Sequence, residues 1–302
     1  MDKDSRAVLE KLRLRDVIVI PISRLEKHDP ELRAVKTQRK KVEYYFTATP
    51  CLPRFLFQTQ PEIDLITYLD ADLFFFDDPE KLFRETAQDD VVIIPHRFPE
   101  TKRHREKHGI YNVAWVSFRR TESGQQCLEW WRARCLEWCH DYVDSQGRYA
   151  DQGYLNEFSA RFSGVRALPH PGANLAPWNL ETHQLSVKDG KVFADGQPLV
   201  FYHFHDLARI SGRAFDTGLT QYGISPDATV RDHVYRPYLR ELLRCEKAPM
   251  ANIRTTGRVM EAANGPAVIT LPESAWERLG RRLREWMGHS PKPETPATKL
   301  EP

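Results

Sequence analysis

The sequence lacks the marks of a membrane-spanning or secreted chain. No apolar run in its 302 residues reaches the roughly 20 residues that a bilayer-spanning helix needs. Residues 1–16 are rich in charge and show no secretory signal. Five cysteines in a chain of this length do not suggest a disulfide framework. We therefore expect a reduced, cytoplasmic protein.

Neither sign of charge is in excess. The chain carries 44 basic and 42 acidic residues, with a formal net charge of +2. Binding to a phosphate backbone usually needs a net basic field, so nucleic acid is not expected as the partner. Hydrophobic residues make up 41% of the chain, so a sizeable core can form. The length suits one large α/β domain, alone or with an appendage.

Strand-like and helix-like segments alternate in the first half of the chain, which predicts a mostly parallel sheet flanked by helices. A helix is expected to end near residue 14, and one or two helices interrupted by Pro50 and Pro53 are expected in 30–57. Strands are predicted at 16–22, 63–76, 91–95 and 112–118, and a long helix at 122–144.

The pattern changes after residue 151. We predict a helix at 153–162, a strand at 165–169, a loop at 170–180, and a hairpin at 185–205 that turns at Asp189-Gly190. Strand signals fade after residue 215. Helices are predicted at 231–246 and 276–287, and the composition of 289–302 is typical of disorder. The helix at 276–287 is basic and amphipathic, so peripheral contact with anionic lipid is one interpretation and a solvated surface helix is the other.

One face of the helix expected at 122–144 carries several cysteine and aromatic side chains. At helical spacing these are Cys127, Trp131, Cys135, Cys139 and Tyr142. A metal cluster of Cys135, Cys139 and His140 is conceivable, but cysteines four residues apart without a second pair are a weak signal. Core packing is the preferred interpretation, because free cysteine behaves as a small buried hydrophobe.

The strongest chemical signal is Asp70-Ala71-Asp72, which lies within a strongly apolar run. On an extended segment the two aspartates would point the same way. Two carboxylates on one face repel unless a cation lies between them, and oxygen ligands suit Mg²⁺ or Mn²⁺. The alternative is a solvated strand end, where both aspartates cap a turn.

A strand followed by Asp-x-Asp is typical of two enzyme families. Phosphatases of the haloacid-dehalogenase type use the first aspartate as a nucleophile and the second as an acid or base. In that family Thr or Val usually stands where this chain has Phe74. The family also needs a later lysine and a paired acid on another strand, for which Asp77-Asp78 and Asp89-Asp90 are poorly placed.

The second family matches at four places in order. YLDADLFFF (68–76), YNVAWVSFRR (111–120), DQGYLNEF (151–158) and LAPWNL with YHFH (175–205) stand in the sequence. Together they resemble the family 8 retaining glycosyltransferases and their bacterial relatives. The resemblance implies a GT-A fold, with one mixed, mostly parallel sheet flanked by helices. It also implies a catalytic domain at 1–215 lacking the first βα unit, a helical C-terminal extension at 216–288 and a disordered tail at 289–302.

The same resemblance implies a metal site. Asp70 and Asp72 would hold Mn²⁺ or Mg²⁺, with His203 as the first choice for a third ligand and His205 as the second. The metal would neutralise charge on the diphosphate of a nucleotide-diphospho-sugar donor, with a UDP-sugar expected. The sugar would move to an unidentified acceptor (a glycan, a lipid-linked sugar or a protein), with retention of configuration.

Further residues follow from the resemblance and from their positions. Asp151 and Gln152 would act at the sugar together with Asn112. Trp115 and Trp178 would stack on sugar or base, although burial in the core is the commoner fate of tryptophan. Asn174 and Asn179 lie in a loop, where binding residues concentrate. By position alone, His96 and Arg97 would line the site. The family's Lys-Pro-Trp after the histidine is missing here, and Arg209 and Arg213 would contact phosphate in its place, although exposed arginines are usually only solvated charge.

Two points about these residues stay open. Asp151 is the one candidate for a nucleophile in a double displacement, and N-capping of the helix that it opens is its alternative role. A chain that lacks the first βα unit could also be an inactive module that binds a carbohydrate or a partner protein.

Overall fold

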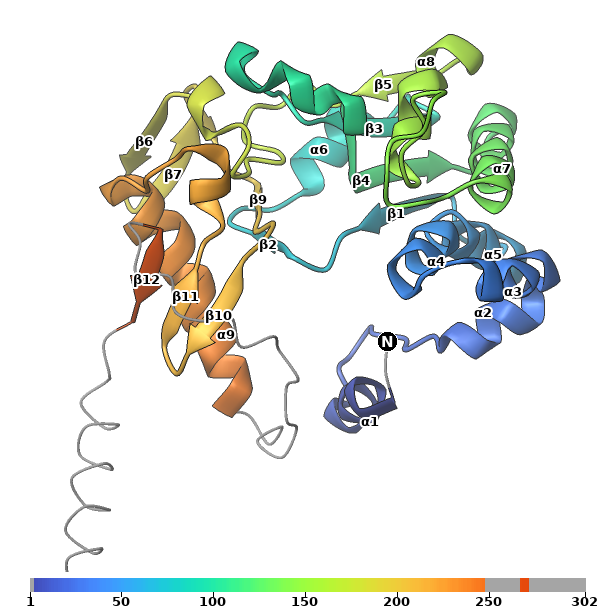
Figure 1. Cartoon of the computed structure of the whole chain (residues 1–302), viewed down its shortest axis with the longest axis horizontal. Helices are drawn as coiled ribbons and strands as arrows, with labels where there is room; N and C mark the ends of the chain where they lie inside the picture. Colours follow the sequence, from blue (N-terminus) through green and yellow to red (C-terminus); the bar gives the residue numbers. More distant parts are fainter. Residues whose placement is uncertain (1–2, 248–266, 272–302) are drawn as a thin grey trace, which may run out of the picture.

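The computed structural model describes residues 3–247 and 267–271. The predicted helix at 276–287 and the predicted disordered tail at 289–302 lie outside these residues. Within them the protein is a mixed α/β structure with several small sheets. Figure 1 shows helices α2–α5 and α7 at one side of the central sheet, and the C-terminal strands with α9 at the other.

The prediction of a mixed sheet flanked by helices is confirmed, but the structure has several small sheets, and the central one is not mostly parallel. Its strand order is β1 (Leu65–Leu69), β4 (Tyr111–Arg119), β3 (Val91–Pro95) and β5 (Val165–Ala167). Strand β4 runs antiparallel to both neighbours, and β3 pairs with β5 in parallel. The cause is the connection between β3 and β4. It forms a 3-10 helix, η2 (Glu100–His108), where a parallel pair usually has an α-helix crossing the sheet face.

Helix α7 (Glu122–Glu137) begins at Thr121, whose side chain accepts a hydrogen bond from the Gly124 amide. It buries Cys127, Trp131 and Cys135 among apolar side chains of the sheet and of η3, and these cysteines are free. The core interpretation of the cysteine face is therefore confirmed. The helix ends earlier than predicted, so Tyr142 does not share that face and is 53% exposed.

Residues 3–59 are mostly helical. The predicted strand at 16–22 is wrong, since Ile18 is 78% exposed and α2 begins at Ile22. Pro50 stands between α4 and α5, whereas Pro53 lies in the first turn of α5, where its missing amide would have no partner within the helix. The helices are α1 (Lys3–Leu12), α2 (Ile22–His28), α3 (Pro30–Val35), η1 (Lys36–Gln38), α4 (Lys41–Ala48) and α5 (Cys51–Thr59).

The run predicted as one strand at 63–76 is two strands in different sheets. Strand β1 ends at Leu69, and β2 (Leu73–Phe75) pairs antiparallel with β9 (Phe201–His203). The break falls on Asp70-Ala71-Asp72, where the chain turns. The two aspartates therefore do not lie on an extended segment, and the reasoning that placed them on one face of a strand is wrong.

The second half of the chain follows the predictions in part. The hairpin of β6 (Leu185–Lys188) and β7 (Lys191–Ala194) turns at Asp189 and Gly190, both with positive φ, as a type I′ turn requires. A helix is also present in 153–162, although its first half is 3-10. The other elements here are α6 (Glu80–Glu85), η3 (Gln152–Glu157), α8 (Phe158–Arg161), η4 (Leu180–Thr182), β8 (Gln197–Pro198) and η5 (Leu219–Tyr222).

Strands continue past residue 215, contrary to the prediction. The sheet order is β10 (Ala208–Ser211), β11 (Ala214–Asp216) and β12 (Val268–Thr270), so the expected boundary at 215 falls inside β11. The helix predicted at 231–246 is present as the π-helical turn η6 (Val230–Tyr235) followed by α9 (Arg236–Lys247). Over the described ranges, we find no helix with both the length and the apolar character needed to cross a membrane.

Candidate functional site

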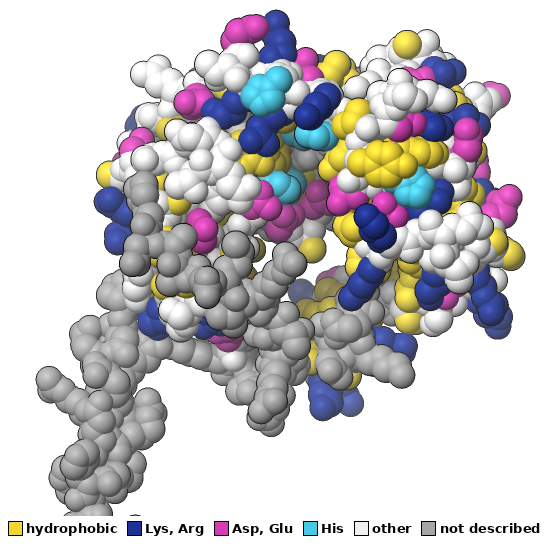
Figure 2. Space-filling view, viewed as in Figure 1, with side chains coloured by type: hydrophobic (Ala, Val, Ile, Leu, Met, Phe, Trp, Pro, Cys, Tyr) yellow, Lys and Arg dark blue, Asp and Glu magenta, His cyan; other side chains and the backbone are white. Residues whose placement is uncertain are grey.

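Segments next to β1 and β4, from the first half of the chain, and next to β9, from the second half, surround a cavity of ≈ 670 Å³. The turn after β1, the end of β9, the start of β4 and the segment before η3 all contribute side chains. Histidine and acidic side chains gather around a hollow on the face shown in Figure 2. Of the residues proposed from the sequence, the ones that line the cavity are Asp70, Asp72, His96, Asn112, Asp151, Gln152, Trp178, His203 and His205.

A carboxylate and two imidazoles form a cluster in this cavity. One potential ligand atom from each of Asp72, His203 and His205 lies within 4.8 Å of the others. Asp72 Oδ1 is 3.1 Å from His203 Nε2. The carboxylate of Asp72 is 44% exposed and the His203 ring is 4% exposed, so the cluster opens to the cavity on the aspartate side. Asp70 lines the same cavity but is outside this group of three.

Strand pairing explains how residues so far apart in the sequence meet. In the antiparallel pair of β2 and β9, Leu73 lies opposite His203, which puts Asp72 beside the imidazole. The Phe204 amide donates to the Asp72 carbonyl oxygen at 2.9 Å and fixes this end of the pair. His205 follows the end of β9, and its ring centroid is 5.8 Å from that of His203.

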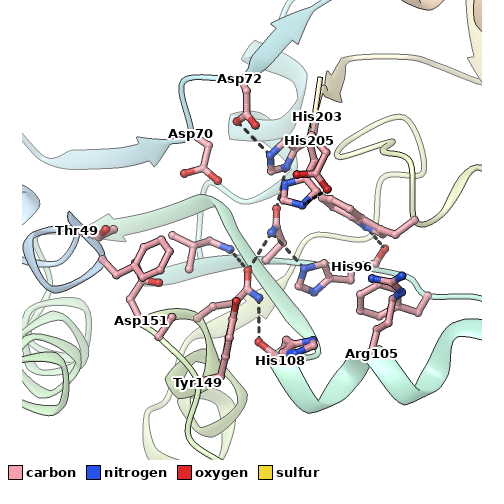
Figure 3. A pocket seen from close by; sticks show the side chains of 18 of the residues that line it. Thr49, Asp70, Asp72, His96, Arg105, His108, Tyr149, Asp151, His203 and His205 are labelled. Carbon is pink, nitrogen blue, oxygen red and sulfur yellow. Dashed lines mark hydrogen bonds and ion pairs between the residues drawn. The ribbon is translucent and has the colours of Figure 1, made fainter. Parts of the chain in front are cut away.

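A buried hydrogen-bond chain leads from the cluster into the protein (Figure 3). Asn112 Oδ1 lies 3.2 Å from His203 Nδ1. Asn112 Nδ2 faces His96 Nε2 at 3.2 Å and donates to Gln152 Oε1 at 3.0 Å. Gln152 Nε2 in turn donates to the His108 carbonyl oxygen at 2.9 Å. Both ends of the Asn112 amide are therefore occupied by protein groups.

This chain fixes the proton on His203. The Asn112 oxygen only accepts hydrogen bonds, so Nδ1 of His203 must be the donor. The other nitrogen, Nε2, then faces the Asp72 carboxylate. In the neutral ring two acceptors would meet at 3.1 Å, and only a shared proton or a cation between them removes the conflict. A metal-binding histidine usually donates its second ring N–H to an acceptor in this manner.

The two carboxylates of the Asp-x-Asp turn differ in acidity. Burial raises the pKa of Asp70 above its ordinary value, although the nearby His203 and a hydrogen bond from Tyr68 oppose the shift. Burial also disfavours ionisation of Asp72, but hydrogen bonding and charge from His203 outweigh it, so its pKa is lowered. Asp72 is therefore the better anion in the absence of a bound cation.

Asp151 is buried at the cavity wall, 4% exposed. Burial raises its pKa to about 7, with a hydrogen bond to Thr49 opposing the shift and the charge of Asp70 adding to it. Its side chain makes no capping bond at the start of η3, so N-capping does not explain this residue. A carboxyl group with this pKa is close to half ionised at neutral pH.

His96 is a second unusual group in the wall. Burial lowers its pKa to about 3, so the ring is neutral. One ring nitrogen faces Asn112, while the other, Nδ1, has no hydrogen-bond partner in the described part of the chain. The ring stacks on Phe98 with centroids 4.7 Å apart.

Four residues proposed from the sequence are held in the core or in structural bonds. Trp115 is 2% exposed and stacks on Phe201. Asn179 is fully buried, and its amide donates to the carbonyl oxygens of His96 and Asn174. Asn174 is also fully buried, with a positive φ. Arg97 donates to three carbonyl oxygens of the segment 168–173.

Trp178 lines the cavity but is 3% exposed. Its ring meets those of His96, His203 and His205 edge-on, with centroids between 5.1 and 5.5 Å apart. Its Nε1 donates to the His96 carbonyl oxygen. Trp178 thus supports the histidine cluster and does not offer a free face for stacking.

Some cavity residues gave no signal in the sequence. Arg105, from η2, lines the cavity, whereas Arg209 and Arg213 lie outside its lining and bond to Glu246 and to the Leu271 carbonyl oxygen, respectively. Thr49, Tyr149 and Tyr222 also line the cavity. These residues belong to no motif, and only the fold brings them together.

Comparison with known proteins places the chain in a family. No family model matches it. It is 36% identical over 219 residues to the protein YfnF of Bacillus subtilis (strain 168), which covers 70% of this chain and 71% of YfnF. The chain belongs to the YfnF family. It is also 29% identical over 246 residues to YfnD of the same organism, covering 81% of the chain and 78% of YfnD. Both proteins are described as uncharacterized, so membership of the YfnF family assigns no activity.

The chemistry of this YfnF-family site must therefore come from its side chains. Asp72, His203 and His205 supply one oxygen and two nitrogen donors for a cation. Asp70 and Asp151 add carboxyl groups that accept hydrogen bonds from hydroxyl groups of a ligand. Aromatic rings and Arg105 line the remaining wall. Such a site suits a polar ligand that carries both hydroxyl groups and negative charge.

Proposed function

We propose that the protein is a metal-dependent glycosyltransferase that moves a sugar from a nucleotide-diphosphate donor, a UDP-sugar in the first instance, to a hydroxyl acceptor. The observation that carries the proposal is the meeting of Asp72, His203 and His205 in a large polar cavity. These residues come from two of the four segments that resemble family 8 glycosyltransferases. The other two segments supply Asn112, Asp151 and Gln152 to the same cavity.

The donor set fits a divalent cation. Asp72 and His203 face each other at 3.1 Å, a contact that a shared proton or a bound cation would stabilise, and the proposal takes the cation. Mg²⁺ prefers an all-oxygen shell, whereas imidazole nitrogens suit later transition metals. A carboxylate with two imidazoles therefore suits a transition metal better than Mg²⁺, and Mn²⁺ is the choice that the family resemblance implies. When bound, the metal would neutralise charge on the departing diphosphate.

The remaining residues have separable roles in this proposal. Asn112 and Gln152 use their amides within the protein, so they position His203 and the wall of the cavity. Asp70 and Asp151 have carboxyl groups available for sugar hydroxyls. Retention of configuration rests on the family resemblance. A double displacement would use Asp151 as the nucleophile, whereas a route on a single face of the sugar needs no such residue.

The two alternatives have less support. A phosphatase of the dehalogenase type needs a lysine beside its aspartates, and the cavity lining contains none in the part of the chain that the structure describes. A binding module without activity would share the cavity but would not require a cation. It predicts ligand binding that persists when the metal is removed.

A thermal-shift screen of sugar nucleotides with and without Mn²⁺ tests the proposal. Binding at 100 times Kd stabilises the folded state by about 2.7 kcal/mol. We expect at least one nucleotide sugar to raise the melting temperature with Mn²⁺ and not with EDTA. Asp72→Asn should abolish the shift, whereas Asp189→Asn, at the exposed hairpin turn, should keep it. A flat response across all donors with Mn²⁺ present would reject the proposal.

A further inference from the structure

The wall of the cavity away from the acidic cluster carries a cation, Arg105. It is the one arginine or lysine in the cavity lining over the described ranges. Its guanidinium carbon lies 4.5 Å from the centroid of the Tyr222 ring, and its Nη2 donates to the Gln221 carbonyl oxygen at 3.1 Å. Helix η2 and helix η5, more than a hundred residues apart in sequence, hold this group in one place.

Arg105 differs from the basic residues beside it on η2. Lys102 pairs with Glu181, and Arg103 pairs with Glu100 at 3.0 Å. No ion pair forms at Arg105 among the residues for which the structure gives positions. A partly buried guanidinium normally has an acidic partner, because removing it from water costs free energy. Asp206 lines the same cavity, but no carboxylate of the described residues comes within ion-pair distance of Arg105, so its guanidinium is open to a ligand.

The geometry of Arg105 suits a planar or tetrahedral anion. One face of the guanidinium lies against Tyr222, and one N–H group is used by Gln221. The guanidinium has five N–H donors, so several remain for a ligand. Its planar arrangement of N–H groups matches two oxygens of a carboxylate or a phosphate at once. Phe98 and Tyr222 also line the cavity and pack in the same hydrophobic cluster, so they add apolar surface to the cavity wall.

Arg105 and the metal cluster lie at different places in the cavity. In Figure 3, Arg105 is across His96 from Asp72. The charge of a donor diphosphate would be neutralised at the cluster. A second anion in the cavity would then belong to the other substrate. This step rests on the proposed function.

We propose that Arg105, supported by Tyr222 and Gln221, binds an anionic group on the sugar acceptor. The acceptor is therefore a hydroxyl compound that carries a carboxylate or a phosphate. This feature of the cavity would select acidic acceptors over neutral sugars, because only the former provide a partner for the guanidinium.

The test is a set of ligand titrations followed by NMR, with EDTA present and no nucleotide. The probes are glycerol 3-phosphate, glucuronate and glucose. The matched control for Arg105→Gln is Arg103→Gln, an exposed arginine of the same helix. We expect at least one anionic probe to bind the unchanged protein and the control variant, with glucose at least about tenfold weaker. The anionic probe that binds more tightly shows whether the site prefers a phosphate or a carboxylate.

Arg105→Gln should weaken binding of the anionic probe by about tenfold or more and leave the binding of glucose unchanged. Equal binding of the anionic probe by both arginine variants would overturn the inference, as would binding of glucose as tight as that of the anions. A melting curve of each variant confirms that it is folded.

A second measurement separates this inference from the proposed function. Stabilisation by UDP with Mn²⁺ is recorded for the same variants. If Arg105→Gln loses stabilisation by UDP as fully as it loses binding of the anionic probe, then Arg105 belongs to the donor site. In that case the inference about the acceptor is wrong, while the proposed function is still supported. If no donor stabilises the unchanged protein but the anion still needs Arg105, the function fails and the anion site stands.

Discussion

The protein takes carboxylates out of water in two regions, and it gives them different partners. Asp29, which begins α3, is 2% exposed and forms a bidentate pair with Arg132 of α7, with distances of 2.5 and 2.7 Å. In the cavity, Asp70 and Asp151 lose much of their contact with water and form no ion pair with a described residue, and their pKa values are raised. The pKa of Asp29 is lowered, because the bonds to Arg132 and to the Leu32 amide outweigh its burial.

The Asp29–Arg132 pair therefore has a structural role, whereas the cavity groups are candidates for ligand binding. The charges of Asp29 and Arg132 are satisfied within the chain, and the pair joins the N-terminal helices to α7. The polar groups of the cavity keep hydrogen-bonding capacity that no described residue uses. The Asp72 carboxylate beside His203 is 44% exposed toward the cavity, and Nδ1 of His96 has no partner among the residues described. Unsatisfied polar groups in a cleft cost stability and are a feature of binding sites.

The largest expected effect comes from breaking the closed pair. Arg132→Met removes both hydrogen-bonded contacts to the buried Asp29 and leaves Arg54, 4.0 Å away, as its only ion-pair partner among the described residues, so we expect a loss of about 3 kcal/mol in the free energy of unfolding. Arg134→Met, which removes an exposed pair with Glu137 on the same helix, should cost at most about 1 kcal/mol. Urea denaturation measures both. Equal losses would show that the Asp29 pair is not the structural link that its burial indicates.

Next in size is the loss of a cation ligand in the cavity. His203→Ala should weaken Mn²⁺ binding by more than about 100-fold, or about 2.8 kcal/mol, since losing a direct ligand exceeds the loss of a supporting one. Stability without metal should change less than in Arg132→Met. Calorimetric titration gives the affinity, and His104→Ala, on the exposed face of η2, is the control. Unchanged Mn²⁺ affinity would remove His203 from the site.

A smaller effect is expected at Asn112, which holds His203 and does not face a ligand. Asn112→Leu removes the acceptor for Nδ1 of His203 and should weaken the binding of Mn²⁺ by about 10- to 100-fold. Asn112→Asp keeps an acceptor at the same place and should retain most of the affinity. If both variants lose affinity equally, Asn112 acts through general damage to the fold and not through the orientation of His203.

The smallest effect is a pH dependence at Asp151. Its folded pKa of about 7 lies above the value of the unfolded chain, so its stability contribution is complete at low pH and is lost as pH rises through 7. Relative to Asp151→Asn, the unchanged protein should lose about 1 kcal/mol between pH 6 and pH 8. Urea denaturation in EDTA at both pH values measures this difference. A difference that stays constant or reverses with pH would mean that Asp151 is ionised throughout.

The sequence predicted the cavity residues better than the sheet that carries them. Asp72, His203, Asp151 and Gln152 were found from short motifs, because local motifs keep their spacing when the surrounding topology varies. Strand direction depends on how the chain returns between strands. The segment between β3 and β4 gave no sign that it would form η2.

Burial was the second property that the sequence could not supply. The β-branched run at 16–22 has the composition of a strand, but a strand needs a neighbour to pair with, and Ile18 is exposed. Trp115 and Asn179 were proposed from motif position, and the fold buries both. Arg105 was missed for the converse reason. A lone arginine in a charged segment gains meaning only when Tyr222 and the cavity lie beside it.

Pulsed electron paramagnetic resonance of the Mn²⁺-loaded protein tests the proposed site most directly. The spectrum should show nitrogen couplings from histidine rings, which weaken in His203→Ala, and a phosphorus coupling that appears when UDP is added. A Mn²⁺ spectrum with oxygen ligands alone, or one that gains no phosphorus coupling with UDP, would contradict a metal–diphosphate site at Asp72, His203 and His205.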